Sequence, residues 1–408
     1  MTVPAFRWQL QNPLGPLRHV NFRLLWTGEL LRQSAQWMDV VTRGFLVLSL
    51  TGSAAQLALV NAVRGAPLLV LGLLSGVLAD RVSRKRLLMA SQTTNVVANV
   101  AVGVLALTGH VQLWHVYVTA ALIGMSTAVN TPARQSMLPS LVPPKDLQGA
   151  VVLNTSTLNL GQALGPIVGG AAVSLVGVGG SYLVQAAIFA VAGSLIKRLV
   201  LPDRAPSVKQ RWRDSAADGV RYLRRHPVLP ALLAVSVVPM LLVQPFRGVV
   251  PAIAAYDLHA DARLTGLLLA ALGAGSVVSF VVLATLPTMP RPGRRIVVQT
   301  VAFSVAIAVF AVSPSYLAAA SALFVGGWLQ SSTRTLTQSL QLDDTEEGYQ
   351  GRISSVWVVN RGMMPIGSLV LAGLTMVVSA STSVAVMSAA GAVITLLVAW
   401  RAPALWRR

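Results

Sequence analysis

Long apolar segments separated by short polar turns recur along the whole 408-residue chain. Each run of 18 or more nearly uncharged residues fits a helix that crosses a hydrocarbon core of about 30 Å. The pattern therefore predicts an all-α membrane protein with twelve transmembrane helices. We place the spans, to within about three residues, near 22–50, 54–79, 87–108, 112–138, 147–176, 180–201, 228–250, 264–286, 296–313, 315–341, 352–378 and 381–400.

The polar turns differ sharply in their content of Lys and Arg. The N-terminal polar segment and every second polar segment after it hold, in chain order, 2, 4, 1, 7, 3, 1 and 3 of these residues, together 21. The six loops between them hold only Arg263. Basic residues favour cytoplasmic loops, so both termini are predicted to be cytosolic. We expect a multi-pass protein of the cell membrane, in contact with membrane lipids.

The longest polar loop, 202–227, divides the chain into two sets of six spans. It is basic, and we expect a short amphipathic helix on the inner membrane face. The sequence before this loop resembles the sequence after it at a constant offset of 202 residues: Gly124 corresponds to Gly326, and Gly165 to Gly367. A parallel repeat of this kind is typical of a two-halved transporter with its substrate site between the halves. We therefore predict pseudo-symmetric halves at 1–201 and 228–408.

Composition narrows the function further. Only 11% of residues are charged, against about a quarter in soluble domains, which disfavours a soluble enzyme. The net charge of +19 follows from the cytosolic loops, so we expect no nucleic-acid partner. Cys is absent, which excludes disulfides and thiolate metal sites. No ATP-binding loop, metal site or cofactor motif is evident, and no cleaved signal is expected at the N-terminus.

The turn between the second and third spans carries the sequence GVLADRVSRKRLL, from Gly76 to Leu88. It resembles the loop signature of the major facilitator superfamily. The resemblance implies a cytosolic gate that includes Gly76, Asp80, Arg81 and Arg84, with Arg352 at the start of the eleventh span as the expected contact region. The alternative is a basic turn that only fixes topology.

The fifth span contains GxxxGPxxGG, formed by Gly161, Gly165, Pro166, Gly169 and Gly170. Glycines at this spacing allow close helix contact, and proline removes a backbone donor. The pattern is similar to the antiporter motif of drug:proton exporters in the superfamily, where it implies a sealed interface that favours export. Generic helix packing is the alternative.

A third similarity points to one branch of the superfamily. The segments NFRLLW from Asn21, LTGS from Leu50 and PARQSMLP from Pro132 resemble the branch of the superfamily that includes enterobactin exporters and macrolide efflux pumps. The similarity covers the first half of the chain well and the second half poorly. It implies export of a small molecule. We expect the protein to be a monomer.

The first span carries five polar residues at steps of 3, 4, 3 and 4, which place them on one helical stripe. Ionisable side chains inside a membrane usually face a cavity, so we expect this stripe to line the substrate cavity. The stripe contains the only acids within the predicted spans, which makes these two the candidate proton carriers; the alternative is structural ion pairing. The five are Glu29, Arg32, Gln36, Asp39 and Arg43.

Several other buried polar residues are candidates for the cavity. Arg64 lies at the depth of Asp39 on the neighbouring span, which predicts an ion pair between them and leaves Glu29 nearer Arg32 alone. Arg361 is mid-span and could meet an anionic substrate or a buried acid; Asn154 could add a polar contact or join helices. Arg134 and Arg334 lie near cytosolic span ends, where we expect them to reach toward the interface.

These features together predict a secondary transporter that exports a drug, siderophore or other metabolite by proton-coupled alternating access. Two further classes stay open. One is a lipid or lysophospholipid flipping protein of the same fold without proton coupling, and the other is a membrane scaffold or receptor that transports nothing. Acidification on the side that the substrate leaves for should speed export only if the protein is the proton-coupled exporter.

Overall fold

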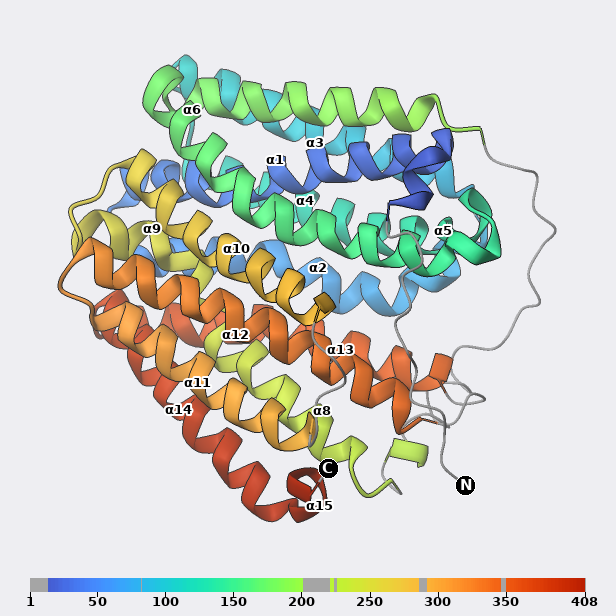
Figure 1. The fold of residues 1–408 in the computed structure, drawn as a ribbon. Helices are drawn as coiled ribbons and strands as arrows, with labels where there is room; N and C mark the ends of the chain where they lie inside the picture. Colours follow the sequence, from blue (N-terminus) through green and yellow to red (C-terminus); the bar gives the residue numbers. More distant parts are fainter. Residues whose placement is uncertain are drawn as a thin grey trace.

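The computed structural model describes the backbone of residues 14–81, 83–200, 221–223, 226–285, 292–345 and 350–407. Side chains are described over the same ranges, except at 70–81, 284–285, 342, 350–359, 361 and 407. Throughout these ranges the regular structure is helical and contains no strand (Figure 1).

The helices follow one another with short connections. In chain order they are η1 Gly15–Arg18, α1 Val20–Thr51, α2 Ala54–Arg81, α3 Arg84–Leu107, α4 Leu113–Gln135, α5 Leu138–Leu141, η2 Pro144–Asp146, α6 Leu147–Lys197, α8 Leu229–Val238, η3 Pro239–Val243, α9 Phe246–Tyr256, α10 Ala262–Thr285, α11 Pro292–Val312, α12 Tyr316–Asp343, α13 Gln350–Thr375, α14 Ala380–Arg401 and α15 Pro403–Arg407.

The long helices supply twelve segments in the described ranges, and each coincides with a predicted span. α6 supplies two of them, because Gly177, with φ of 71°, has a non-helical backbone within it. α8, the π-helical turn η3 and α9 together supply one segment. Pro239 begins the π-helical turn, and a residue without a backbone N–H readily interrupts the α-helical hydrogen-bond pattern. This segment reaches Tyr256, six residues beyond its predicted end at 250.

Length and composition alone mark six stretches of the described residues as able to cross a membrane. α1 is long enough but is not one of them, because its charged and polar residues lower its mean hydropathy. These residues are mostly buried within the bundle, so α1 crosses as an interior helix. The six stretches are Arg84–Leu107, Pro144–Lys197, Leu229–Tyr256, Ala262–Leu283, Pro292–Val312 and Ala380–Arg401.

The first and last six segments pack mainly among themselves. α1 and α3 pack on α6, and α2 packs on α4; α12 packs on α10 and α11, and α14 on α11. Two extensive contacts join the sets, α6 with α10 and α2 with α13. Glycine makes the first possible, since a Cβ on Gly273 would lie 2.6 Å from the carbonyl carbon of Gln162. Such close approach is typical of membrane helix interfaces.

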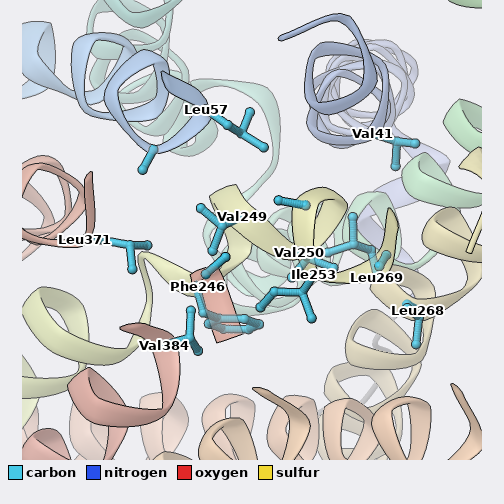
Figure 2. Close-up of a cluster of buried hydrophobic side chains, with 14 of the residues drawn as sticks. Val41, Leu57, Phe246, Val249, Val250, Ile253, Leu268, Leu269, Leu371 and Val384 are labelled. Atoms are coloured by element: carbon cyan, nitrogen blue, oxygen red, sulfur yellow. The ribbon is translucent and has the colours of Figure 1, made fainter. Parts of the chain in front are cut away.

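The buried apolar residues separate into clusters along the bundle axis. The largest joins both sets and includes Val41 and Leu57 with Phe246, Ile253 and Leu371 (Figure 2). It lies toward the end opposite to the one where α1 begins and α14 ends, which we call the terminal end. At the terminal end the described core is divided in two: one cluster contains Phe22, Leu88 and Ile196, and the other Leu229, Ile296 and Leu340. The side chains of 70–81 in α2 and 350–359 in α13 lie outside the described residues, so the core shared by the two sets is described away from the terminal end.

Candidate functional site

The polar stripe of α1 is buried inside the bundle. Glu29, Arg32, Asp39 and Arg43 are each less than 5% exposed, and Gln36 is partly exposed. Charged groups in a membrane interior need partners, and the structure supplies them from α1 itself and from α2 and α4. The stripe forms two ion-pair clusters, one around each acid.

Glu29 lies at the centre of the first cluster. The guanidinium of Arg32 binds it in a bidentate manner, with Nε to Oε2 at 2.7 Å and Nη2 to Oε1 at 2.6 Å. Gln33 Nε2 donates to Oε1 at 3.0 Å. Arg134 Nε, from α4, lies 3.3 Å from the same oxygen. The expectation that Glu29 pairs with Arg32 alone is therefore wrong.

Arg134 also binds Asn154 of α6, since its Nη1 donates to the amide oxygen. The Arg134 side chain is 8% exposed, so the prediction that it reaches toward the membrane interface is wrong. It has two polar partners in the interior, Glu29 and Asn154. The Glu29 cluster therefore ties α1, α4 and α6 together.

Asp39 lies at the centre of the second cluster. Its Oδ2 lies 2.7 Å from Arg43 Nη1 and 2.7 Å from Arg64 Nη1 of α2, so the ion pair predicted between Asp39 and Arg64 is present. Arg43 Nη2 also donates to Asn61 Oδ1 at 2.9 Å. The amide of Asn61 donates in turn to the carbonyl oxygen of Gly248 in α9 at 3.2 Å. The Asp39 cluster thus extends to the second set of helices.

A third set of polar contacts, which we call the central polar patch, joins α1 to α4 and α9 to α12 and α1. Gln36 Nε2 donates to Thr127 Oγ1 at 2.9 Å. Arg247 Nη2 donates to the amide oxygen of Gln330, and Arg247 Cζ lies 5.1 Å from the centre of the Trp37 ring. All five side chains are partly exposed. The patch contains groups from both sets of helices, as a substrate cavity between them requires.

Arg247, Trp37, Thr127 and Gln330 were not among the residues predicted from sequence. With a span ending at 250, Arg247 would lie beside the membrane interface. The helix continues to Tyr256, so Arg247 lies nine residues inside the segment. The run GVVPAIAAY after Arg247 is apolar enough to have signalled this.

The glycines of the fifth span contact two neighbours. A Cβ on Gly161 would lie 2.6 Å from Gln33 Cβ, and one on Gly165 would lie 2.6 Å from Trp37 Cβ; Gly169 faces Met38 in the same manner. Gly170 faces Ala262, at the start of α10, and Pro166 is adjacent to Gly266 of that helix. The motif therefore allows α6 to approach α1 on one side and α10 on the other.

The turn between α2 and α3 is shorter than predicted, because α2 continues to Arg81 and α3 begins at Arg84. Arg84 Nη1 donates to the carbonyl oxygen of Ser136 at 2.7 Å, which joins the turn to the end of α4 in the same set of helices. Gly76, Asp80 and Arg81 belong to α2, and Arg352 and Arg361 to α13, but their side chains lie outside the described residues. Most of the 202–227 loop also lies outside them.

A profile of the transmembrane secretion effector family matches residues 11–405, nearly the whole chain. The chain belongs to this family. Transmembrane secretion effectors are a group within the major facilitator superfamily, so the resemblance noted in the loop signature is confirmed.

Curated relatives are consistent with this membership. The enterobactin exporter EntS of Citrobacter koseri is 28% identical over 362 residues, which cover 86% of each chain. The enterobactin exporter EntS of Salmonella typhimurium is 27% identical over 364 residues, which cover 86% of this chain and 87% of the relative.

Solved structures agree on the fold. A POT family transporter in complex with a thioalcohol-conjugated peptide has a TM-score of 0.75 at 11% identity, covering 94% of this chain and 96% of that chain. The nucleoside transporter NupG has a TM-score of 0.73 at 12% identity, covering 95% of this chain and 100% of that chain. This transmembrane secretion effector is therefore a multi-pass membrane exporter with the twelve-helix superfamily fold, and it is not an enzyme.

Proposed function

We propose that this transmembrane secretion effector exports a siderophore-like small molecule by alternating access, in exchange for protons. The observation that carries the proposal is the buried charged stripe of α1, which is connected to both sets of helices through Asn61 and the central polar patch. The curated relatives named enterobactin exporters support the substrate class.

Alternating access requires two units that close around the substrate site at one end and part at the other. We assign residues 1–201 and 228–408 as these units, joined by 202–227. The described apolar core is shared by both units away from the terminal end, which supports a state that is closed at the opposite end. Because Lys and Arg concentrate in the loops at the terminal end, we assign the terminal end to the cytosol and the closed end to the outside of the cell.

Proton coupling follows from the geometry of the two acids. A proton on Glu29 removes the negative charge that attracts Arg32 and Arg134, and a proton on Asp39 removes the charge that attracts Arg43 and Arg64. Either event weakens a contact of α1 with α4 or α2. Proton binding can therefore change how helices pack around the cavity, which is what coupling requires. We assign Glu29 as the principal carrier and Asp39 as the second.

The cytosolic gate belongs to the same proposal. We assign Gly76, Asp80, Arg81 and Arg84 to the gate, and the region of Arg352 in α13 as the surface it meets on the second unit. Arg361, further along α13, is assigned to the substrate cavity. The close packing of α2 with α13, where a Cβ on Gly65 would lie 3.1 Å from Pro365 Cβ, supports contact between these helices. The protein acts as a monomer in this scheme.

Export from proteoliposomes tests the proposal. The purified chain is reconstituted, enterobactin is loaded on the cytosolic side, and release is followed with and without acidification of the opposite side. We expect acidification to accelerate release. Glu29→Gln or Asp39→Asn should remove the acceleration, whereas Arg401→Gln, at an exposed site at the end of α14, should retain it.

The possible results separate the parts of the proposal. If both acid variants keep the acceleration, the assignment of the proton carriers is wrong. If enterobactin does not move under any gradient, the siderophore-like substrate is wrong.

A further inference from the structure

We propose that Arg247, with Gln330 and Trp37, forms a binding subsite for a negatively charged group of the exported molecule. The inference deepens the proposed export function and rests on it. It specifies that the substrate is an organic anion and names the side chain that binds its charge.

Positive charges outnumber negative charges among the described ion pairs of the membrane interior. Arg32 and Arg134 pair with Glu29, and Arg43 and Arg64 pair with Asp39. No carboxylate in the described part of the chain lies within ion-pair distance of Arg247, a further arginine inside these segments. Together with Arg247, the described clusters contain five arginines and two acids. A guanidinium in a membrane interior without a counterion is costly, so the site is suited to an anionic ligand.

The hydrogen-bonding capacity of Arg247 is only partly used. A guanidinium has five N–H donors and no acceptor. For Arg247, Nη2 donates to Gln330, and Nη1 has no hydrogen-bond acceptor among the described residues. Nη1 is therefore the nitrogen that can donate to a ligand. A carboxylate or phenolate oxygen is an acceptor that carries the required charge.

Arg247 lies at an accessible position between the two sets of helices. Arg32, Arg43 and Arg134 are all buried, whereas Arg247, Gln330 and Trp37 are partly exposed. The three side chains come from α9, α12 and α1, so the subsite lies between the two sets of helices. Arg334 lies one turn beyond Gln330 on α12 and is a second cation on this side of Arg247.

Trp37 adds a requirement on shape. Its ring lies 5.1 Å from the Arg247 guanidinium carbon, and its Cβ is held by the close approach of Gly165. A fixed indole beside a cation suits a ligand whose anionic group is attached to an aromatic ring, since the rings can stack while the charge pairs. We therefore expect aryl carboxylates or aryl phenolates to be preferred.

Equilibrium binding to the full chain in lipid nanodiscs tests this subsite. The probes are 2-naphthoate and its neutral isostere 2-naphthamide, measured by isothermal titration calorimetry. We expect the wild type to bind naphthoate at least about tenfold more tightly, as a charge-assisted hydrogen bond provides. Arg247→Gln should reduce this preference to about onefold without changing naphthamide affinity, and Arg247→Lys should keep most of it. Arg401→Gln should behave as wild type.

Equal binding of the two probes by the wild type, or a preference retained by Arg247→Gln, would overturn the subsite. Unchanged naphthamide binding shows that a variant is folded. If Arg247→Gln does not fold, Gln330→Leu is measured instead and should weaken the binding of naphthoate but not of naphthamide. Equal effects of Gln330→Leu on the two probes would count against the proposal. Enterobactin release by the wild type is measured in parallel. Absence of release together with an Arg247-dependent naphthoate preference would refute the proposed substrate and leave the subsite intact.

Discussion

The pair between Glu29 and Arg134 gives the sharpest energetic prediction. The two groups approach to 3.3 Å, with side chains 3% and 8% exposed. At an effective dielectric constant of about 20, this separation corresponds to an attraction of about 5 kcal/mol. Loss of hydration offsets part of it, and Arg32 shares the carboxylate. We therefore expect a coupling energy of about 2–3 kcal/mol between Glu29 and Arg134.

A double-mutant cycle measures this quantity. Wild type, Glu29→Gln, Arg134→Gln and the double variant are unfolded reversibly by SDS in mixed micelles, and the four free energies of unfolding are compared. The cycle cancels the loss of the Asn154 contact, which occurs in both variants of Arg134. A matched cycle of Glu29 with the exposed Arg401 should give a coupling near zero. If the Glu29–Arg134 coupling is also near zero, Arg134 lies at the interface and our account of the Glu29 cluster is refuted.

Three further predictions follow from the packing and the gate. Gly165→Ala should destabilise the protein by about 1–3 kcal/mol, because the added Cβ would lie 2.6 Å from Trp37 Cβ. The control Gly373→Ala should be neutral, because no atom lies within 4 Å of its added Cβ. Equal midpoints of SDS unfolding for the two variants would contradict the close packing of α6 on α1. Asn61→Ala removes the hydrogen bond from Asn61 to Gly248, which joins α2 to α9. If this bond holds the extracellular end closed, a thiol reagent should label an introduced extracellular cysteine faster in the variant. An unchanged labelling rate would show that the bond does not hold the extracellular end closed. Asp80→Asn should shift the equilibrium toward the inward-open state, and unchanged labelling of a cytosolic cysteine would refute the assignment of Asp80 to the gate.

Much of the fold and part of the site could be predicted from sequence. Apolar run length determines how many helices cross the membrane, and it places residues such as Asp39 and Arg64 at a common depth. Two such residues on neighbouring helices can pair, and they do.

Hydropathy does not determine how a helix is rotated about its axis, and this explains the error at Arg134. Glu29 and Arg134 are 105 residues apart, and their contact depends on how α4 packs on its neighbours. Gly124 is part of that packing, because it brings α4 against the backbone of Arg64 in α2. A glycine with this role is indistinguishable in the sequence from one that faces lipid. Arg247 was missed for a different reason, since a span end misjudged by six residues changed an interior cation into an interfacial one.

The central claim is that substrate export and proton entry are one process carried by the acids of α1. The most direct test is to measure both fluxes in the same proteoliposomes, with a pH-sensitive dye on the cytosolic side and labelled enterobactin in that compartment. The account predicts that enterobactin release acidifies the cytosolic side at a fixed ratio of protons to substrate, and that Glu29→Gln alters that ratio. Release of enterobactin with no accompanying proton movement would contradict the account.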